Sequence, residues 1–105
     1  MFWNVQSLIN KLDDIKMHTQ DLDVDILCLT EHWLDHKLTL IKLPGYRIAD
    51  WYCRPTGKHG GSVIFIKEKF ICTKYANISD LGMESVFEIS SVFIKSLDLL
   101  CICIY

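Results

Sequence analysis

The chain has 105 residues, a formal net charge of −2 and a hydrophobic fraction of 50%. This length is enough for one domain or part of one, and the charges form no basic stripe of the kind that marks a duplex-binding module. No apolar run approaches the ~20 residues that a membrane-spanning helix needs. The start of the chain also lacks the basic segment and apolar core of a signal peptide. We therefore expect an intracellular protein, nuclear or cytoplasmic, that is neither secreted nor membrane-bound.

The cysteines support the same compartment. There are 5 of them, an odd number, and no two are spaced as CxxC. Cys28, Cys101 and Cys103 lie in apolar runs, where cysteine behaves as a small buried hydrophobic residue. A disulfide framework is therefore not expected, and a reducing compartment is favoured.

The first part of the chain predicts a strand, a helix and a second strand. Residues 2–5, "FWNV", are short and apolar and are expected to form a strand. In "SLINKLDDIKMHT", Leu8, Leu12 and Ile15 recur at helical spacing, and Ser7 is a candidate N-cap. The continuous apolar run "VDILCLT", residues 24–30, is typical of a strand covered on both faces. Together these segments predict a βαβ-like unit.

The remainder predicts strands. After a turn at Pro44 and Gly45, residues 46–52 and 62–70 form the two arms of a hairpin around the glycine-rich loop 53–61. Residues 71–76 are a weaker strand candidate. Residues 85–95 and 99–105 form a final pair, and the last of these, "LLCICIY", is apolar on both faces. We expect these strands to form a meander of about five.

One helix is too little to cover such a sheet on both faces. At ~25 cal/mol per Å², several hundred Å² of bare sheet corresponds to about 10 kcal/mol of lost stabilisation. The sequence therefore predicts that a second layer lies outside this chain.

The segments "WNVQSLINKLDDI", "DILCLTEHWL", "LPGYRIADWYCRPTGKHGGSVIFIKEKF" and "CICIY" resemble the endonuclease/exonuclease/phosphatase superfamily. Within it they look most like the apurinic-type endonuclease domains of non-LTR retrotransposons. The resemblance runs from about Phe2 to Tyr105. Its most specific piece is "VDILCLTEHWL", and the hairpin strand that follows Gly60 and Gly61 is the second.

The resemblance implies an α/β (α+β) fold, the N-terminal half of a four-layer α/β sandwich, with a mixed, mostly antiparallel sheet and one main helix. Residues 1–105 would be a partial domain whose C-terminal half is absent. Members of the superfamily hydrolyse phosphodiester or phosphomonoester bonds with Mg²⁺, at the strand ends along one edge. The partner implied for the intact domain is DNA.

Three site residues follow from the resemblance. Glu31 matches the metal-binding glutamate, and Asn4 matches the asparagine that closes the first strand and orients site groups. Tyr105 matches the tyrosine that contacts the region of the scissile phosphate. The later "GDFN"-like and "SDH"-like motifs, which supply the remaining catalytic groups, have no counterpart in the chain. Milder departures are His32 for a second Thr, Ser62 for a third Gly and Gln6 for a frequent Arg.

Each of these residues also has a plain structural interpretation. Glu31 is then a strand-end acid, Asn4 a turn or cap residue and Tyr105 an ordinary strand aromatic. His32 and His36 would share one face of a helix, but "EHWLDH" is not the HExxH order of a zinc site. The other polar and aromatic candidates are expected to be loop, strand-end or packing residues: Asp35, Asp50, His59, Trp3, Trp33 and Trp51.

The functional expectation is a fragment of a Mg²⁺-dependent DNA endonuclease of a retrotransposon, inactive alone because one carboxylate holds Mg²⁺ only weakly. Two alternatives stay open. One is a non-catalytic interaction module whose exposed sheet face self-associates, and the other is a decayed mobile-element remnant. The sequence leaves open the substrate and whether the chain is an enzyme.

Overall fold

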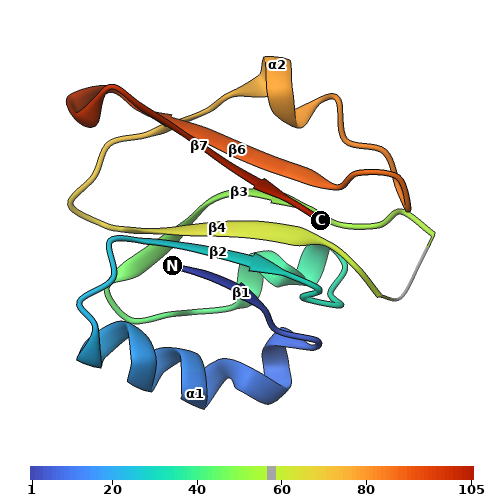
Figure 1. Cartoon of the computed structure of the whole chain (residues 1–105). Coiled ribbons are helices and arrows are strands. Elements are labelled where there is room, and N and C mark those ends of the chain that lie inside the picture. Colours follow the sequence, from blue (N-terminus) through green and yellow to red (C-terminus); the bar gives the residue numbers. More distant parts are fainter. Residues whose placement is uncertain (57–58) are drawn as a thin grey trace.

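Two β-sheets lie face to face in the structure, a computed structural model that describes residues 1–56 and 59–105 (Figure 1). The four-stranded sheet has the order β1-β2-β4-β3, and its strands are β1 (Phe2–Asn4), β2 (Ile26–Thr30), β4 (Ser62–Lys67) and β3 (Tyr46–Tyr52). The three-stranded sheet has the order β5-β6-β7, and its strands are β5 (Thr73–Lys74), β6 (Ile89–Ile94) and β7 (Leu99–Ile104).

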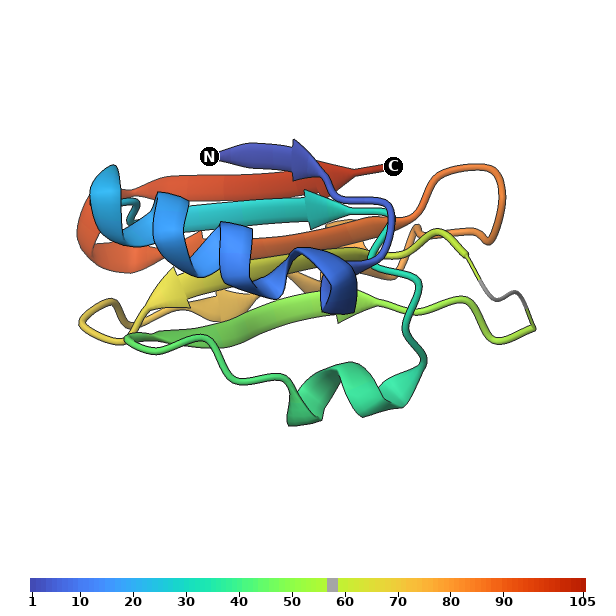
Figure 2. The same ribbon diagram turned by 90° about the horizontal axis from the view of Figure 1, so that it is seen from below.

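The predicted strand–helix–strand unit is confirmed. β1 and β2 pair in parallel, and α1 (Leu8–Asp21) connects them across the outer face of the four-stranded sheet (Figure 2). Ser7 occupies the N-cap position with a φ of 88°, but its side chain makes no capping hydrogen bond. The left-handed backbone at Gln6 and Ser7 instead turns the chain sharply from β1 into the helix.

Alternation along β2 and β4 divides the core into two layers. Leu27, Leu29, Val63 and Phe65 pack with the apolar side of α1, because alternate side chains of a strand point to the same face. The short 3₁₀ helix η1 (His36–Leu40), which the sequence did not predict, adds the fully buried Leu38 to this layer. The other side chains of β2 and β4 form a second layer against the three-stranded sheet, made of Ile64, Val92 and Cys103 with Ile26, Cys28, Ala49, Cys72 and Cys101.

The hairpin and the final strand pair are also confirmed. β3 and β4 are antiparallel, with a bulge between Ile48 and Asp50, and β6 and β7 are antiparallel through a short turn, η2 (Lys95–Leu97). Part of the predicted hairpin loop, residues 57–58, lies outside the described residues. The weaker strand is reduced to the two residues of β5, and a single helical turn, α2 (Ala76–Ser79), follows it.

The expected single meander is wrong, and so is the expectation that the second layer lies wholly outside the chain. The strands after residue 70 form a separate sheet that covers the inner face of the first one (Figure 1). What stays uncovered is the outer side of β7, where Leu100, Ile102 and Ile104 are 39%, 40% and 55% exposed. Apolar side chains on this side of β7, at the margin of the smaller sheet, therefore remain uncovered.

Asp50 links the two sheets, although the sequence predicted a strand-end polar residue. It is buried within β3, and its Oδ2 accepts hydrogen bonds from the Ser79 hydroxyl at 2.5 Å and the Ser91 N–H at 2.8 Å. A buried carboxylate needs such donors, because its desolvation is otherwise costly.

In the part of the chain that the structure describes, no helix is long and apolar enough to cross a membrane.

Candidate functional site

The C-terminal ends of β1 and β2 lie side by side at one rim of the molecule. In the parallel register Asn4 is opposite Thr30, and the Val5 N–H donates to the Thr30 carbonyl at 3.0 Å. Glu31 is the next residue after β2. Figure 2 shows the arrowheads of both strands and of β7 pointing toward this rim. The predicted pair, Asn4 and Glu31, therefore emerges from neighbouring strand ends, as parallel pairing requires.

The backbone around Glu31 is held in an unusual conformation. Glu31 and Trp33 both have a φ of 61°, in the left-handed region that non-glycine residues rarely adopt. Two hydrogen bonds hold this segment against the neighbouring loop, from the Glu31 N–H to the Gly61 carbonyl at 2.9 Å and from the Trp33 N–H to the Gly60 carbonyl at 3.1 Å. Strained backbone of this kind persists only where the surrounding structure holds it in place, and it is found most often at functional sites.

This conformation fixes the Glu31 side chain. Its carboxylate accepts a hydrogen bond from the indole N–H of Trp33. The Trp33 ring in turn stacks on the imidazole of His59, with the ring centroids 4.2 Å apart and the planes 29° from parallel. His59 is exposed, as predicted for a loop residue, but the stack was not expected. Trp33 was expected to be a packing residue; it packs on His59 and in addition donates a hydrogen bond to the acid.

Glu88 joins the second sheet to the same rim. It is 1% exposed, its Oε1 lies 2.5 Å from Nε of Arg54, and its Oε2 accepts from the Gly61 N–H at 2.5 Å. Glu88 and Tyr105 exchange both backbone hydrogen bonds at 3.0 Å. The chain of contacts Tyr105–Glu88–Gly61–Glu31 therefore places the third predicted residue on the rim that carries the first two.

Tyr105 itself lines a small pocket at this rim. The pocket has a volume of about 260 Å³ and is formed by Arg54, Ser85, Val86, Glu88 and Tyr105. No motif in the sequence marks Arg54 or Glu88 as a site residue. Both become neighbours of the predicted site only when the two sheets pack, so no spacing in the sequence identifies them.

His32 is a structural residue of the rim and not a metal ligand. It is buried, its Nε2–H donates to the Tyr52 carbonyl at 2.8 Å, and its Nδ1 accepts from the Leu34 N–H at 3.0 Å. Burial lowers the pKa of the imidazole, which keeps it neutral. Both ring nitrogens are occupied, so the zinc alternative with His36 fails. Within residues 1–56 and 59–105, no group of three His, Cys, Asp or Glu side chains is arranged to hold a metal ion.

Three buried hydroxyl groups lie in the strands that lead to this rim. Thr30 and Ser62 are register partners at the rim end of β2 and β4, directly before Glu31 and directly after Gly61. Ser90 lies two residues after Glu88. Among the described residues these hydroxyls have no hydrogen-bond partner, and buried polar groups are normally paired. Their presence makes this end of the layer between the sheets polar.

The donors at the rim fit Mg²⁺ in kind. Mg²⁺ takes oxygen ligands and is commonly held by one or two carboxylates, with water and substrate phosphate filling the remaining positions. The Glu31 carboxylate and the Asn4 amide oxygen are of this type. The set supplies a single carboxylate, which is the minimum for such an ion.

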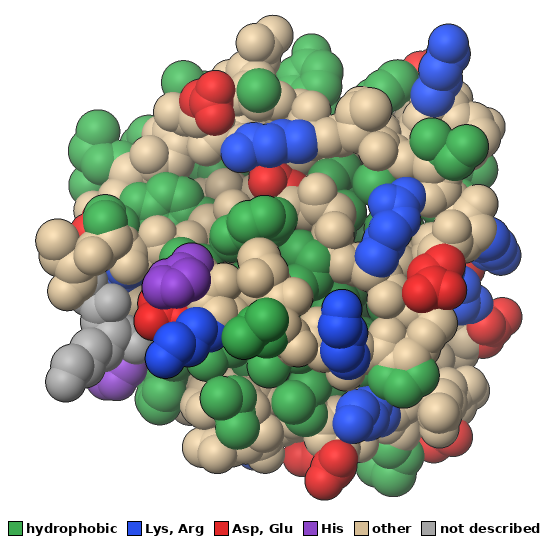
Figure 3. All heavy atoms as spheres, turned by 180° about the vertical axis from the view of Figure 1, so that it is seen from behind, with side chains coloured by type: hydrophobic (Ala, Val, Ile, Leu, Met, Phe, Trp, Pro, Cys, Tyr) green, Lys and Arg blue, Asp and Glu red, His purple; other side chains and the backbone are tan. Residues whose placement is uncertain are grey.

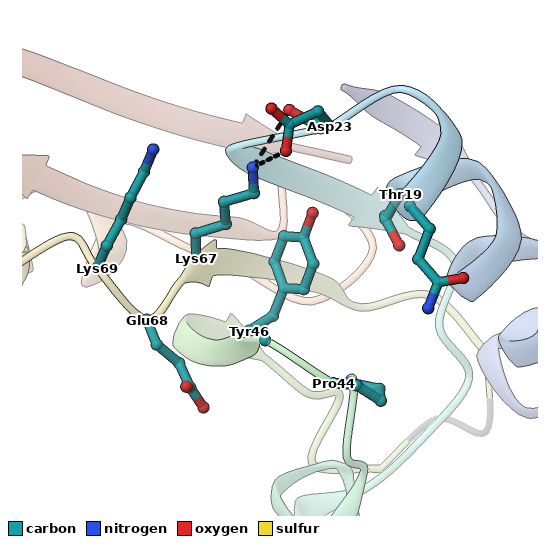
Figure 4. A pocket seen from close by; sticks show the side chains of 9 residues that line it. Thr19, Asp23, Pro44, Tyr46, Lys67, Glu68 and Lys69 are labelled. Carbon is teal, nitrogen blue, oxygen red and sulfur yellow. Dashed lines mark hydrogen bonds and ion pairs between the residues drawn. The ribbon is translucent and has the colours of Figure 1, made fainter.

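A larger pocket, of about 360 Å³, lies at the opposite rim (Figure 4). There the Lys67 amino group contacts the Asp23 carboxylate and lies 3.3 Å from Asp25. The hydroxyl of Tyr46 donates to the carbonyl of Val24. Each charged group in Figure 4 that could act on a substrate is thus paired or exposed to water. Size alone does not make this pocket the site.

Comparison with known proteins identifies the family of the chain. The model of the Endonuclease/Exonuclease/phosphatase family matches residues 1–100. No curated protein matches the sequence. The family generally uses a divalent metal ion, which is the chemistry that the oxygen donors at Glu31 and Asn4 suit. The chain therefore belongs to the endonuclease/exonuclease/phosphatase family.

Proposed function

We propose that this chain forms the Glu31 side of the active site of a Mg²⁺-dependent phosphodiesterase, a DNA endonuclease of the retrotransposon type. The observation that carries the proposal is the placement of Asn4 and Glu31 at the ends of adjacent parallel strands. The strained backbone at Glu31 and the bond from Trp33 add support, since they hold the carboxylate in one orientation. A fixed carboxylate loses less conformational freedom when it binds an ion.

In this proposal each residue has a separate role. Glu31 is the metal ligand, and Asn4 orients groups beside it. Tyr105 lies near the phosphate, where its hydroxyl can donate a hydrogen bond. Mg²⁺, when bound, neutralises charge on the phosphoryl oxygens and lowers the pKa of a bound water. The Trp33 indole keeps the Glu31 carboxylate turned toward the rim.

The same residues are insufficient for turnover, and we propose that the chain alone is inactive. Hydrolysis needs a group that takes a proton from water and one that stabilises the leaving oxygen. Both ring nitrogens of His32 already form hydrogen bonds, and the Glu88 carboxylate is already bound by the Arg54 side chain and the Gly61 N–H. The Asp and Asp–His motifs that the resemblance implies for these roles have no counterpart in residues 1–105.

Terbium luminescence tests the metal site directly. Tb³⁺ prefers oxygen ligands, and a bound ion would be sensitised by Trp33. The measurement uses a Trp3→Phe/Trp51→Phe background, so that Trp33 is the only indole. We expect a luminescence signal that excess Mg²⁺ displaces and that Glu31→Gln abolishes. Asp35→Asn is the control, because Asp35 is an exposed acid on the same loop and caps η1 through the Lys37 N–H. Equal signals from Glu31→Gln and the background protein would overturn the proposal.

A plasmid-nicking assay tests the proposal that the chain alone is inactive. The wild-type chain with Mg²⁺ is expected to leave supercoiled DNA intact. Nicking that disappears in Glu31→Gln would support the site and refute the inactivity. Nicking that persists in Glu31→Gln would contradict the role of this carboxylate.

A second candidate function is self-association without catalysis. The observation that favours it is β7, whose segment Leu99–Ile104 carries no charge and whose outer side chains are exposed. Only β6 pairs with β7 among the described residues, so one side of the β7 backbone is free for another strand. The occupant that fits is β7 of a second copy, because antiparallel pairing of this strand with itself would bury the same apolar residues from both chains.

A further inference from the structure

The Trp33–His59 stack is an aromatic surface beside the proposed metal ligand. The indole N–H of Trp33 bonds to the Glu31 carboxylate, and the exposed imidazole of His59 covers the indole face. An exposed ring this close to the proposed metal ligand is placed to contact a bound substrate. We propose that the stack is a binding site for an unpaired nucleobase of the substrate strand, which stacks on the outer face of His59. This inference rests on the proposed function.

The backbone shows how the stack is held. The hydrogen bonds from Glu31 to Gly61 and from Trp33 to Gly60 join the two loops at positions adjacent to both rings. Gly60 and Gly61 have φ values of 77° and 90°, which only glycine adopts without strain, and they turn the chain directly after His59. Trp33 cannot rotate away without losing its bond to Glu31. The two rings are therefore positioned before any ligand binds, and this lowers the entropic cost of binding.

The ring pair offers a flat face on which a base can stack. Arg54 is already paired with Glu88. Figure 3 shows Lys and Arg side chains spread over the face seen from behind, most of them on its right-hand side. Phosphate contacts make nucleic-acid binding strongly dependent on salt, whereas base–aromatic stacking tolerates any sequence because every base has a π-face. Binding at the stack should therefore depend on bases and only weakly on salt.

The position relative to Glu31 also favours a nucleic acid. One side chain, Trp33, separates the outer ring from the carboxylate. A base on His59 would therefore belong to a nucleotide next to the phosphate at the metal site. A phosphorylated sugar or lipid headgroup has no flat aromatic face to place there. An unpaired base is required, because a base inside a duplex has both faces covered by its neighbours.

Fluorescence anisotropy with a short labelled single-stranded DNA oligonucleotide tests the inference. The buffer contains EDTA, so that the result does not depend on the metal site. We expect His59→Ala to weaken binding by about tenfold and His59→Phe to restore it, because phenylalanine keeps a flat ring without the imidazole nitrogens. His36→Ala is the matched control, since it removes another exposed histidine outside the stack. It should bind as the wild type does.

A second probe separates bases from phosphates. An oligonucleotide of the same length that carries the sugar–phosphate backbone without bases should bind the wild type as weakly as His59→Ala binds normal DNA. Equal binding of both oligonucleotides to the wild type would overturn the inference, as would unchanged affinity in His59→Ala or failure of His59→Phe to rescue. Displacement of the oligonucleotide by an inositol phosphate to the same extent in wild type and His59→Ala would assign binding to phosphate alone.

The two proposals fail in distinguishable ways. Loss of terbium binding in Glu31→Gln, together with base-dependent DNA binding, supports both. If terbium binding does not need Glu31, the proposed function fails whatever the oligonucleotides show. If Glu31 holds the metal but the base-free strand binds as well as DNA, only the stacking site fails.

Discussion

The carboxylate of Glu88, which directly precedes β6 of the second sheet, accepts a hydrogen bond of 2.5 Å from the N–H of Gly61, which directly precedes β4 of the first sheet. Its other oxygen lies 2.5 Å from Arg54. The Gly61 carbonyl accepts from the Glu31 N–H at 2.9 Å. The proposed metal ligand is thus fixed to the second sheet through one glycine, and the geometry of the rim depends on the packing of the two sheets.

Glu88→Ala should destabilise the protein strongly. The change removes one partner of a buried ion pair and leaves the Gly61 N–H without an acceptor, for an expected loss of about 3 kcal/mol. Urea unfolding followed by tryptophan fluorescence measures it. The control is Glu84→Ala, since the carboxylate of the half-buried Glu84 accepts, among the described residues, from the Thr56 hydroxyl alone, at 2.9 Å. Its loss should stay below about 1 kcal/mol. Similar losses of unfolding free energy for both variants would show that the Glu88 contacts between the sheets contribute little to stability.

Gly61→Ala should cost more than Gly45→Ala. Both glycines have a left-handed φ, 90° and 81°, so both substitutions carry a backbone penalty of about 1–2 kcal/mol. At Gly45 no atom lies within 4 Å of the added Cβ, whereas at Gly61 the Cβ would lie 2.1 Å from Nε2 of His32. The buried imidazole would have to move and lose its bond to Tyr52. Equal unfolding free energies for the two variants would contradict the close contact.

His32 should make the fold sensitive to acid. Burial lowers its pKa below the ordinary value of 6.5, so the unfolded chain binds a proton more readily than the folded one. Stability from this group is therefore present above pH 6.5 and decreases as the pH falls below it. His32→Gln retains a side-chain N–H for the Tyr52 carbonyl and does not titrate. Urea unfolding at pH 7.5 and 5.5 should show a smaller decrease for the variant, and an equal decrease would assign the pH dependence to other groups.

Local patterns in the sequence were enough to predict the strands and the main helix. The helical spacing of Leu8, Leu12 and Ile15 predicted α1, and the continuous apolar run before Glu31 predicted a strand covered on both faces. The division into two sheets was not predictable in this way. β6 and β7 would show the same alternation of side chains in one sheet or in two. The two-sheet arrangement depends on the packing of their inner side chains against those of β2 and β4.

The polar contacts of the site needed the structure for a different reason. Glu88 lies in "SVFEISS", where nothing marks the acid as buried, and Arg54 and Gly61 reach it from a distant loop. The Trp33–His59 stack depends on left-handed backbone at Glu31 and Trp33. Sequence patterns indicate left-handed backbone at glycine and asparagine, but not at a glutamate or a tryptophan.

The free edge of β7 is expected to make the chain self-associate. An uncharged, exposed strand edge is a template for pairing with another chain. β1 is the corresponding margin of the larger sheet, and Figure 2 shows both strands on the same side of the molecule. We therefore expect the chain to form a dimer whose proportion rises with concentration, measured by size-exclusion chromatography with light scattering.

Ile102→Lys should shift this equilibrium to the monomer, because Ile102 lies near the middle of β7 with 40% exposure and the lysine ammonium would have to be desolvated in the paired state. Ile9→Lys is the control, since Ile9 is 58% exposed on α1, away from β7, and the substitution adds the same charge. If Ile9→Lys dissociates the dimer equally, net charge and not the strand edge controls assembly. A wild-type chain that stays monomeric at every concentration would remove self-association as a candidate function and leave the proposed metal site unaffected.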